Sequence, residues 1–269
     1  MRTPIASLIL AAALAGAACS SEENQAAKAR IFSPEDPPRV LQAAAEPLDS
    51  ARLGQDGDLV NRVFAISGQE AAARLGPHVQ KAKVTFQWSR AGKEVALSED
   101  RMIALGNGGD FHVRIENDQR QGMEWVKVDG TSYARSRYAQ FRERRRDRGS
   151  SEHVVASAYS TLSTFNDWVH GAMRFTPAGT VRVDGRQAVK YTVSLGEPNE
   201  PKPAHPLPEI IWPKNGPDLD TQLRQRALEQ GKTANVTGTL VVDEKTAVPL
   251  LADLQATVVV PADEGESRL

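Results

Sequence analysis

The chain has 269 residues, a formal net charge of −1 and one cysteine. The balanced charge argues against a nucleic-acid-binding protein, since such proteins usually carry a strong basic excess. A single cysteine excludes a disulfide framework and a cysteine-based zinc site. The residues beyond about position 58 are numerous enough for one sizeable core, so we expect one β-rich domain.

The first residues have the layout of a secretory signal. Met1 and Arg2 give a positive start, residues 5–18 are mostly apolar, and small residues precede Cys19. This pattern predicts a signal peptide over residues 1–18. The apolar run is shorter than the roughly 20 residues that a membrane-spanning helix needs.

Residues 14–19, LAGAAC, resemble the lipobox of bacterial lipoproteins, although Gly16 stands where leucine is usual. The resemblance implies that Cys19 carries acyl chains and anchors the protein in the bacterial cell envelope. Ser20, in place of aspartate, implies the outer membrane, facing the periplasm. The alternative is a soluble secreted protein. Lipidation is favoured because it removes a free thiol from an oxidising compartment.

The segment after the cysteine is predicted to be a tether. Residues 19–57 are polar and rich in Ala and Pro, with few large apolar side chains. Such a segment cannot bury enough surface to offset the entropy of ordering it. The folded domain is therefore expected over residues 58–269.

The first predicted element of that domain is a helix over residues 58–76, with Asp58 as N-cap, Gly76 as stop and Gly68 as a possible break. Alternation then predicts strands, with a hairpin turning at Asp129-Gly130. Strand patterns occur at 84–89, 110–118, 123–138, 173–179, 180–185 and 186–196, and turn residues at 106–110 and 117–122.

The remaining elements are two helices, an insert and a terminal hairpin. Residues 151–170 carry apolar side chains on one broad face, which predicts an amphipathic helix. A proline-rich insert follows at 197–218, and then a helix at 219–230. Two long strands at 233–246 and 247–260 end the domain, joined by a turn at 243–246.

Few helices and eight to ten antiparallel strands predict an α+β fold: a curved antiparallel sheet whose concave face is covered by two or three helices. If a helix packs incompletely into the hollow of such a sheet, an apolar groove remains beside it. Small apolar ligands bind in grooves of this kind.

The last hairpin, TLVVDEKTAVPLLADLQATVVV, resembles that of the bacterial half-barrel lipid carriers, the LolA, LolB and LppX-type proteins. The order of elements over residues 58–260 and the segment EWVKVDGTSYAR are also similar to theirs. The resemblance implies an unclosed barrel that holds acyl chains of a lipid or lipoprotein. The proline-rich insert and an arginine-rich loop depart from the compact carriers, so cargo transfer and simple binding both stay open.

Aromatic and apolar side chains are the candidate lining of that groove, and those of the 151–170 helix are its candidate lid. Any sheet core would contain the same residue types, and the core interpretation is favoured. The candidates are Phe86, Trp88, Phe111, Trp125, Tyr159, Leu162, Phe165, Trp168, Tyr191 and Leu254.

An arginine-rich run is the candidate contact for lipid headgroups or a membrane face, because guanidinium groups pair with phosphate. The alternative, a solvated hairpin extension that protects a sheet edge, is favoured. The run contains Arg142, Arg144, Arg145, Arg146 and Arg148.

No catalytic or metal-ligand motif is present. The five histidines lack paired spacing, and there is no nucleophile elbow or Walker sequence, so we expect no enzyme, cofactor or metal. The sequence predicts an envelope lipoprotein that binds lipid acyl chains or lipoproteins. The alternative is a membrane-tethered scaffold that binds a protein partner through its insert, where Pro201, Pro203, Pro206 and Pro208 suit an extended conformation.

Overall fold

The computed structural model describes residues 48–90, 93–147, 149–197, 227–262 and 265–268. The predicted signal peptide, Cys19 and most of the predicted tether lie outside the described residues. So do Arg148 and the proline-rich insert beyond residue 197.

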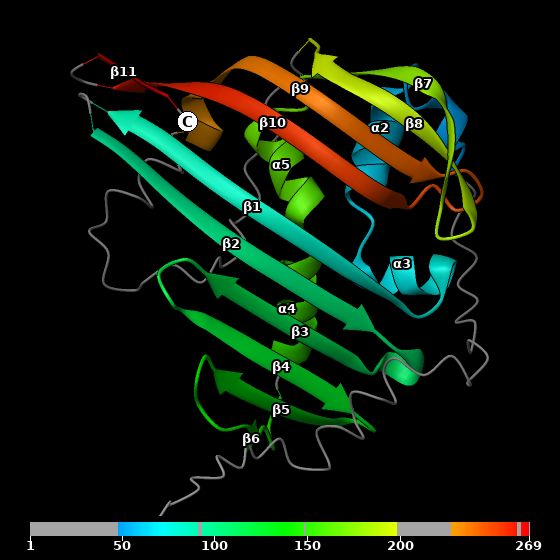
Figure 1. Ribbon diagram of the computed structural model, residues 1–269, viewed down its shortest axis with the longest axis vertical. Coiled ribbons are helices and arrows are strands. Elements are labelled where there is room, and N and C mark those ends of the chain that lie inside the picture. Colours follow the sequence, from blue (N-terminus) through cyan, green and yellow to red (C-terminus); the bar gives the residue numbers. More distant parts are fainter. Residues whose placement is uncertain (1–47, 91–92, 148, 198–226, 263–264, 269) are drawn as a thin grey trace, which may run out of the picture.

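The described residues form one eleven-stranded antiparallel sheet (Figure 1), in the order β6-β5-β4-β3-β2-β1-β11-β10-β9-β8-β7. Strands β6 and β7 lie at opposite edges, so the sheet is open. The α+β half-barrel prediction is confirmed. The strands are β1 (His78–Arg90), β2 (Lys93–Leu105), β3 (Phe111–Asn117), β4 (Gly122–Val128), β5 (Thr131–Ser136), β6 (Arg142–Glu143), β7 (Met173–Val183), β8 (Arg186–Leu195), β9 (Lys232–Asp243), β10 (Pro249–Ala262) and β11 (Gly265–Arg268).

The helices lie on one face of this sheet, behind the strands in Figure 1. More helices are present than the two or three predicted, because residues 65–67 divide the first predicted helix and Ser160 divides the second. Ser67 begins the second helix of the first pair by accepting a hydrogen bond from the Glu70 amide at 3.1 Å. The described helices are η1 (Ser50–Arg52), α2 (Gly57–Phe64), α3 (Gly68–Leu75), η2 (Asn107–Gly109), α4 (Ser150–Tyr159), α5 (Thr161–Trp168) and residues 227–230.

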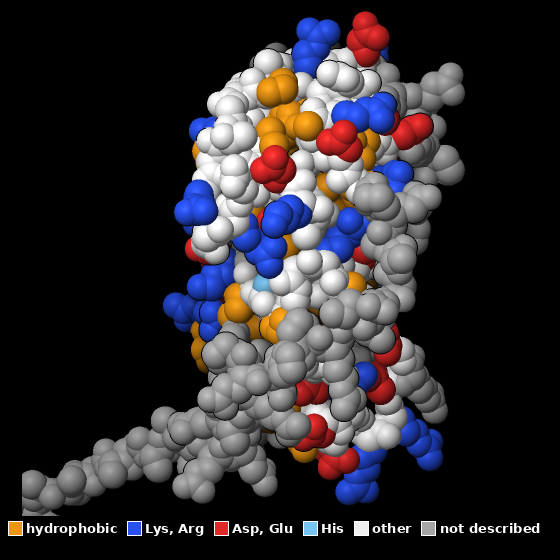
Figure 2. All heavy atoms as spheres, turned by 90° about the vertical axis from the view of Figure 1, so that its right-hand side faces the viewer, with side chains coloured by type: hydrophobic (Ala, Val, Ile, Leu, Met, Phe, Trp, Pro, Cys, Tyr) orange, Lys and Arg blue, Asp and Glu red, His pale blue; other side chains and the backbone are white. Residues whose placement is uncertain are grey.

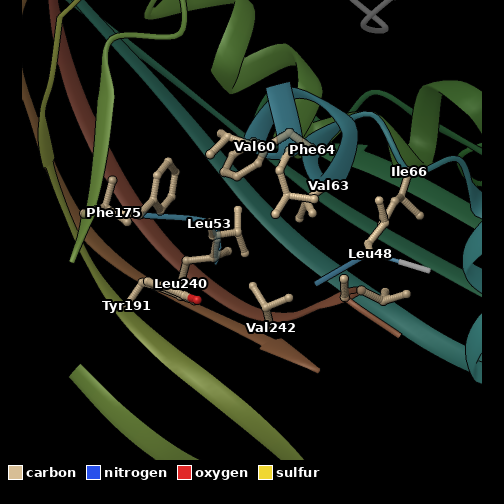
Figure 3. Packing of buried hydrophobic residues seen from close by; sticks show 14 of the residues in the cluster. Leu48, Leu53, Val60, Val63, Phe64, Ile66, Phe175, Tyr191, Leu240 and Val242 are labelled. Atoms are coloured by element: carbon tan, nitrogen blue, oxygen red, sulfur yellow. The ribbon is translucent and has the colours of Figure 1, made fainter. Parts of the chain in front are cut away.

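Two apolar cores hold the helices to the sheet. In the first core, Val63 and Phe64 of α2 pack among side chains from β7, β8 and β9 (Figure 3). In the second, α4 places Val154 and Ala158 among inward-facing side chains of β2, β3 and β4. Burial of an apolar side chain of this size contributes about 1.5–3 kcal/mol, so these contacts fix the helices over opposite halves of the sheet.

The folded domain begins earlier than the predicted boundary at residue 58. Leu48 and Leu53 are buried in the first core, and Asp49 caps η1 by accepting a hydrogen bond from the Ala51 amide at 3.0 Å. The last residues of the predicted tether are therefore packed. These leucines are the two large apolar residues among the polar and small residues of 48–57, which is why hydropathy alone assigned the segment to the tether.

Candidate ligand-binding site

The sheet has a weak junction between its two halves. Strand β11 pairs with β10 over four residues but with β1 only at Ser89, opposite Arg268. The facing edges of β1 and β10 have no pairing strand in the described chain over residues 78–85 and 249–258. We call this interval the seam. Strands β10 and β1 diverge along it toward the right of Figure 1.

Helix α5 lies behind the seam and is visible between β10 and β1 in Figure 1. Two contacts fix it along β1. The Tyr159 hydroxyl, just before α5, lies 3.4 Å from Nε2 of His78, and the Trp168 ring at the end of α5 lies 5.5 Å from that of Phe86. Asn166 also donates a hydrogen bond to Asn61 of α2 at 3.2 Å. The helix therefore forms the inner wall of the seam.

Apolar side chains around the seam are only half buried. On the inward face of β1, Val84 and Phe86 are half buried. On the same face of neighbouring β2, Leu97 and Ile103 are only 3% and 1% exposed. Leu254 of β10 is also half buried. Ala256 of β10 and Leu162 and Phe165 of α5 share this intermediate exposure. The inner face is thus closed over β2 and accessible along the seam.

Polar atoms accompany this apolar lining. Among the described residues, Gln80 Oε1, Thr161 Oγ1 and Trp168 Nε1 are buried without a hydrogen-bond partner. A buried polar atom without a partner costs about 1–3 kcal/mol, so the helix is not optimally packed here. Close by, the Arg101 guanidinium pairs with Glu99 at 2.5 Å and donates to the Ser157 carbonyl at 3.0 Å, which holds the end of α4 against β2.

The histidine at the wide end of the seam favours its neutral form. Burial lowers the pKa of His78; its contact with the Gly76 carbonyl opposes this shift, and the Arg186 charge adds to it. Nδ1 of His78 lies 2.9 Å from that carbonyl. Burial also raises the pKa of Tyr159. His78 and Tyr159 are therefore uncharged near neutral pH.

The structure distributes the predicted lining residues over three clusters. Phe111 and Trp125 are buried in the second core beneath α4, and Tyr191 is buried in the first core. A third cluster joins Phe86 and Trp168. Leu162, Phe165 and Leu254 pack at the border of the first core, and Tyr159 contacts both main cores. Trp88 lies in β1, opposite Val95, but its side chain is outside the described side chains.

The arginine run lies apart from the seam. Arg142, Arg144, Arg145 and Arg146 are exposed in or just after β6, at the far edge of the sheet from β1. Arg144 stacks over the Trp125 ring at 5.5 Å, and Arg145 lies 3.7 Å from Glu143. These local contacts match the solvated-edge alternative. The structure does not bring the arginines and the seam together.

A polar cluster on the outer face of the sheet was missed in the sequence. Glu124 receives hydrogen bonds from His112, at 2.5 Å from Nε2, and from Arg135, and the Arg135 guanidinium stacks over Phe141. Burial raises the pKa of Glu124, but hydrogen bonds and charges from His112 and Arg135 outweigh it and lower the pKa to about 2. The sequence signal that could have identified this cluster is the alternation of apolar and polar residues, which places His112, Glu124 and Arg135 on one face of the sheet.

The structure supports no metal or membrane-spanning assignment. Within the described ranges, no cluster of His, Asp, Glu or Cys side chains is placed to hold a metal ion. No helix of that part is long and apolar enough to cross a membrane. The face in Figure 2, toward which the seam widens, carries hydrophobic patches interspersed with Lys, Arg and acidic side chains.

Comparison with solved structures finds neighbours of low similarity. No protein-family model and no curated sequence matches the chain. The Pseudomonas aeruginosa MucA/MucB complex matches at 16% identity and a TM-score of 0.22, over 79% of this chain and 53% of that one. A crystal structure of MucB matches at 17% identity and a TM-score of 0.21, over 78% of this chain and 55% of that one.

A third neighbour is LprF from Mycobacterium bovis, at 13% identity and a TM-score of 0.22, over 77% of this chain and 89% of that one. The present chain spans about half the length of the MucB chains that it matches. The relation to all three is distant, and none of them assigns a role to a residue of this chain.

Proposed function

We propose that this protein binds the acyl chains of a lipid on the inner face of its half-barrel, and that the chains reach this face through the seam. The observation that carries the proposal is the half-buried apolar lining around α5. Over β2 the inner face is closed by Leu97 and Ile103, whereas Val84, Phe86, Leu162, Phe165 and Leu254 around the seam are half buried.

Apolar burial supplies the binding free energy. At about 25 cal/mol per Å², covering roughly 300 Å² of acyl chain and lining gives roughly 7 kcal/mol before the entropy of association is subtracted. His78 and Tyr159 at the wide end favour their uncharged forms, and the Glu99–Arg101 ion pair beside Val84 is satisfied within the protein. The proposal therefore needs no charged contact inside the site.

Mass spectrometry of an organic extract tests this proposal directly. The domain from residue 48 onward is purified without detergent from a bacterial envelope, then offered phospholipid in excess and re-purified. We expect one lipid per protein molecule. An empty extract in both preparations, from folded protein, contradicts the proposal.

A matched pair of variants on β10 locates the site. Leu254 faces the seam lining and is half buried, whereas Leu251 on the same strand is 55% exposed. Leu254→Glu places a charge among the lining side chains, so we expect retained lipid to fall at least about tenfold, which corresponds to about 1.4 kcal/mol. Leu251→Glu should retain the wild-type amount. Equal retention in the two folded variants would mean that the lipid binds elsewhere.

The membrane anchor is a separate part of the proposal. We propose a lipid anchor at Cys19 and an envelope location, which place the domain beside a supply of lipid. Cys19→Ser should move the protein from the membrane to the soluble envelope fraction and remove the mass of the acyl chains from the N-terminal peptide. A membrane-bound Cys19→Ser protein would contradict the assignment of the anchor.

A further inference from the structure

In the described chain, the seam lacks a strand that would pair with the facing edges of β1 and β10. We propose that it binds an extended peptide, which pairs with β1 and β10 and completes the sheet between them. This inference goes beyond acyl-chain binding, because the ligand proposed for the seam is a partner polypeptide that lies in the plane of the sheet. It gives the protein-binding alternative a specific site.

Strand β11 provides the precedent within the molecule. It lies between β10 and β1 at the narrow end of the seam and runs antiparallel to both. Strands β1 and β10 therefore run parallel to each other, and a strand inserted along the line of β11 is antiparallel to both. Antiparallel pairing is the more stable kind per residue.

The size of the seam suits a short peptide. Residues 78–85 of β1 and 249–258 of β10 offer backbone edges of eight and ten residues, and eight residues of strand extend over roughly 26 Å. At the narrow end, Arg268 of β11 pairs both with Ser89 of β1 and with Val259 of β10, so one strand already separates the two edges there. The proposed peptide continues the line of that strand into the seam.

The flanking side chains define the chemistry of the peptide. On the inner side, a peptide side chain meets Val84 and Leu254. On the outer side, it emerges between the exposed residues Lys81 and Lys83 of β1 and Asp253 of β10. The matching peptide alternates apolar and polar residues, with charged groups of both signs tolerated on its outer face. Its backbone supplies the affinity, as in other cases of strand addition.

Such a peptide would also cover the path to the inner face. The seam is the route proposed for acyl chains, and a strand paired in the seam would close this route. Peptide and lipid would then occupy adjacent layers of one site, the peptide in the sheet and the acyl chain against α5.

Hydrogen exchange on the chain from residue 19 onward, carrying Cys19→Ser, tests the inference. The probe is a ten-residue synthetic peptide that alternates valine and threonine. Its control is the same peptide with an N-methyl group on every amide, which cannot donate a hydrogen bond to either strand. We expect the first peptide to slow amide exchange in residues 78–85 and 249–258 at least tenfold and to leave β3 unchanged, with no effect of the control.

Three results would overturn the inference: no slowing with either peptide, equal slowing with both, or slowing by oleate but not by peptide. Each readout uses protein stripped of lipid. An empty lipid extract together with peptide-specific protection would reject acyl-chain binding but not the peptide site. Bound lipid without peptide-specific protection would reject the peptide site but not acyl-chain binding.

Discussion

Tyr191 joins the beginning of the folded domain to β8, the strand next to the β7 edge of the sheet. Its side chain is fully buried, and its hydroxyl donates a hydrogen bond to the Ser50 carbonyl. Ser50 in turn donates from its own hydroxyl to the Glu244 carbonyl at 3.2 Å. The residues around Ser50 are thereby tied to β8 and to the turn after β9. This network explains why a polar segment at the end of the predicted tether is ordered.

Tyr191→Phe should lower the free energy of unfolding by about 1–2 kcal/mol, because it leaves a buried carbonyl without its donor. Urea unfolding at pH 7 measures the change. Tyr138→Phe is the control, since Tyr138 is 77% exposed, and it should change stability by less than about 0.5 kcal/mol. Equal losses in the two variants would argue against a stabilising role of the hydroxyl.

Glu124 gives the protein a pH-dependent part of its stability. The pKa of this carboxyl is lowered in the folded state to about 2, below its ordinary value of 4.5, so the ionised form stabilises the fold. That contribution is complete above about pH 4.5 and is lost as the pH falls toward 2. A tenfold change in the proton affinity of a carboxylate corresponds to about 1.4 kcal/mol, so the ionised Glu124 contributes on the order of 3 kcal/mol.

Glu124→Gln should therefore destabilise the protein at pH 7 by about 2–3 kcal/mol and flatten the dependence of stability on pH between 5 and 2. Urea titrations across that range make the comparison. Glu143→Gln, at an exposed position on β6, should follow the wild-type curve. A Glu124→Gln curve parallel to the wild type would refute the role of the carboxylate.

At the scale of elements, alternation of side chains was the most informative sequence signal. It predicted β3, β8, β9 and β10, and the turn at Asp129-Gly130, where both residues have positive φ values of 51° and 78°. Strand β2 was missed because Glu99 and Arg101 face the interior and break the apolar pattern. Their ion pair can be recognised only when β1 and β3 are in place on either side.

The two divided helices have a related explanation. A continuous apolar face predicted one helix over residues 151–170, but α4 covers β2, β3 and β4, whereas α5 packs against α2 and the first core. A straight helix cannot follow a sheet that curves between these positions. The break at Ser160, whose hydroxyl donates to the Ser157 carbonyl at 2.9 Å, changes the direction.

Close contact between β9 and β10 depends on Gly238. Its φ is 149°, and a Cβ atom there would lie 2.0 Å from the Asp253 carbonyl oxygen. Gly238→Ala should lower the free energy of unfolding by about 3 kcal/mol. Gly185→Ala, in the open turn between β7 and β8, should cost about 1 kcal/mol, because only its φ of 79° is unfavourable. Thermal and urea unfolding would compare the two, and similar losses would contradict the steric account.

At the scale of the whole molecule, the sheet consists of two meanders. Strands β1 to β6 follow one another, as do β7 to β11, and among the described residues the two sets pair with each other only through β11 and β1. The sequence predicted the β4–β5 and β9–β10 hairpins because each is local. It did not predict the seam, because the junction joins residues far apart in the chain and β11 has only four residues.

Deletion of residues 265–269 should loosen this junction. The described part of the sheet then keeps no strand pair between β1 and β10, so we expect amide exchange in both strands to accelerate at least tenfold. Exchange in β3 and β8 should stay as in the wild type. Glu266→Gln, which keeps the backbone of β11, is the control. Uniform acceleration across all strands would indicate that the two meanders do not behave as separate units.

The strand order also affects how the chain folds. Within each meander, every strand pairs with its neighbour in sequence, so most of the loops that must close are short and their entropic cost is small; the exception is the long connection from Leu195 of β8 to Lys232 of β9. The pair between Ser89 and Arg268 instead closes a loop of almost the whole domain. Each meander can therefore form early and independently, and the junction between them forms last. The ligand-binding region proposed here is the part of the molecule that folds latest and opens most readily.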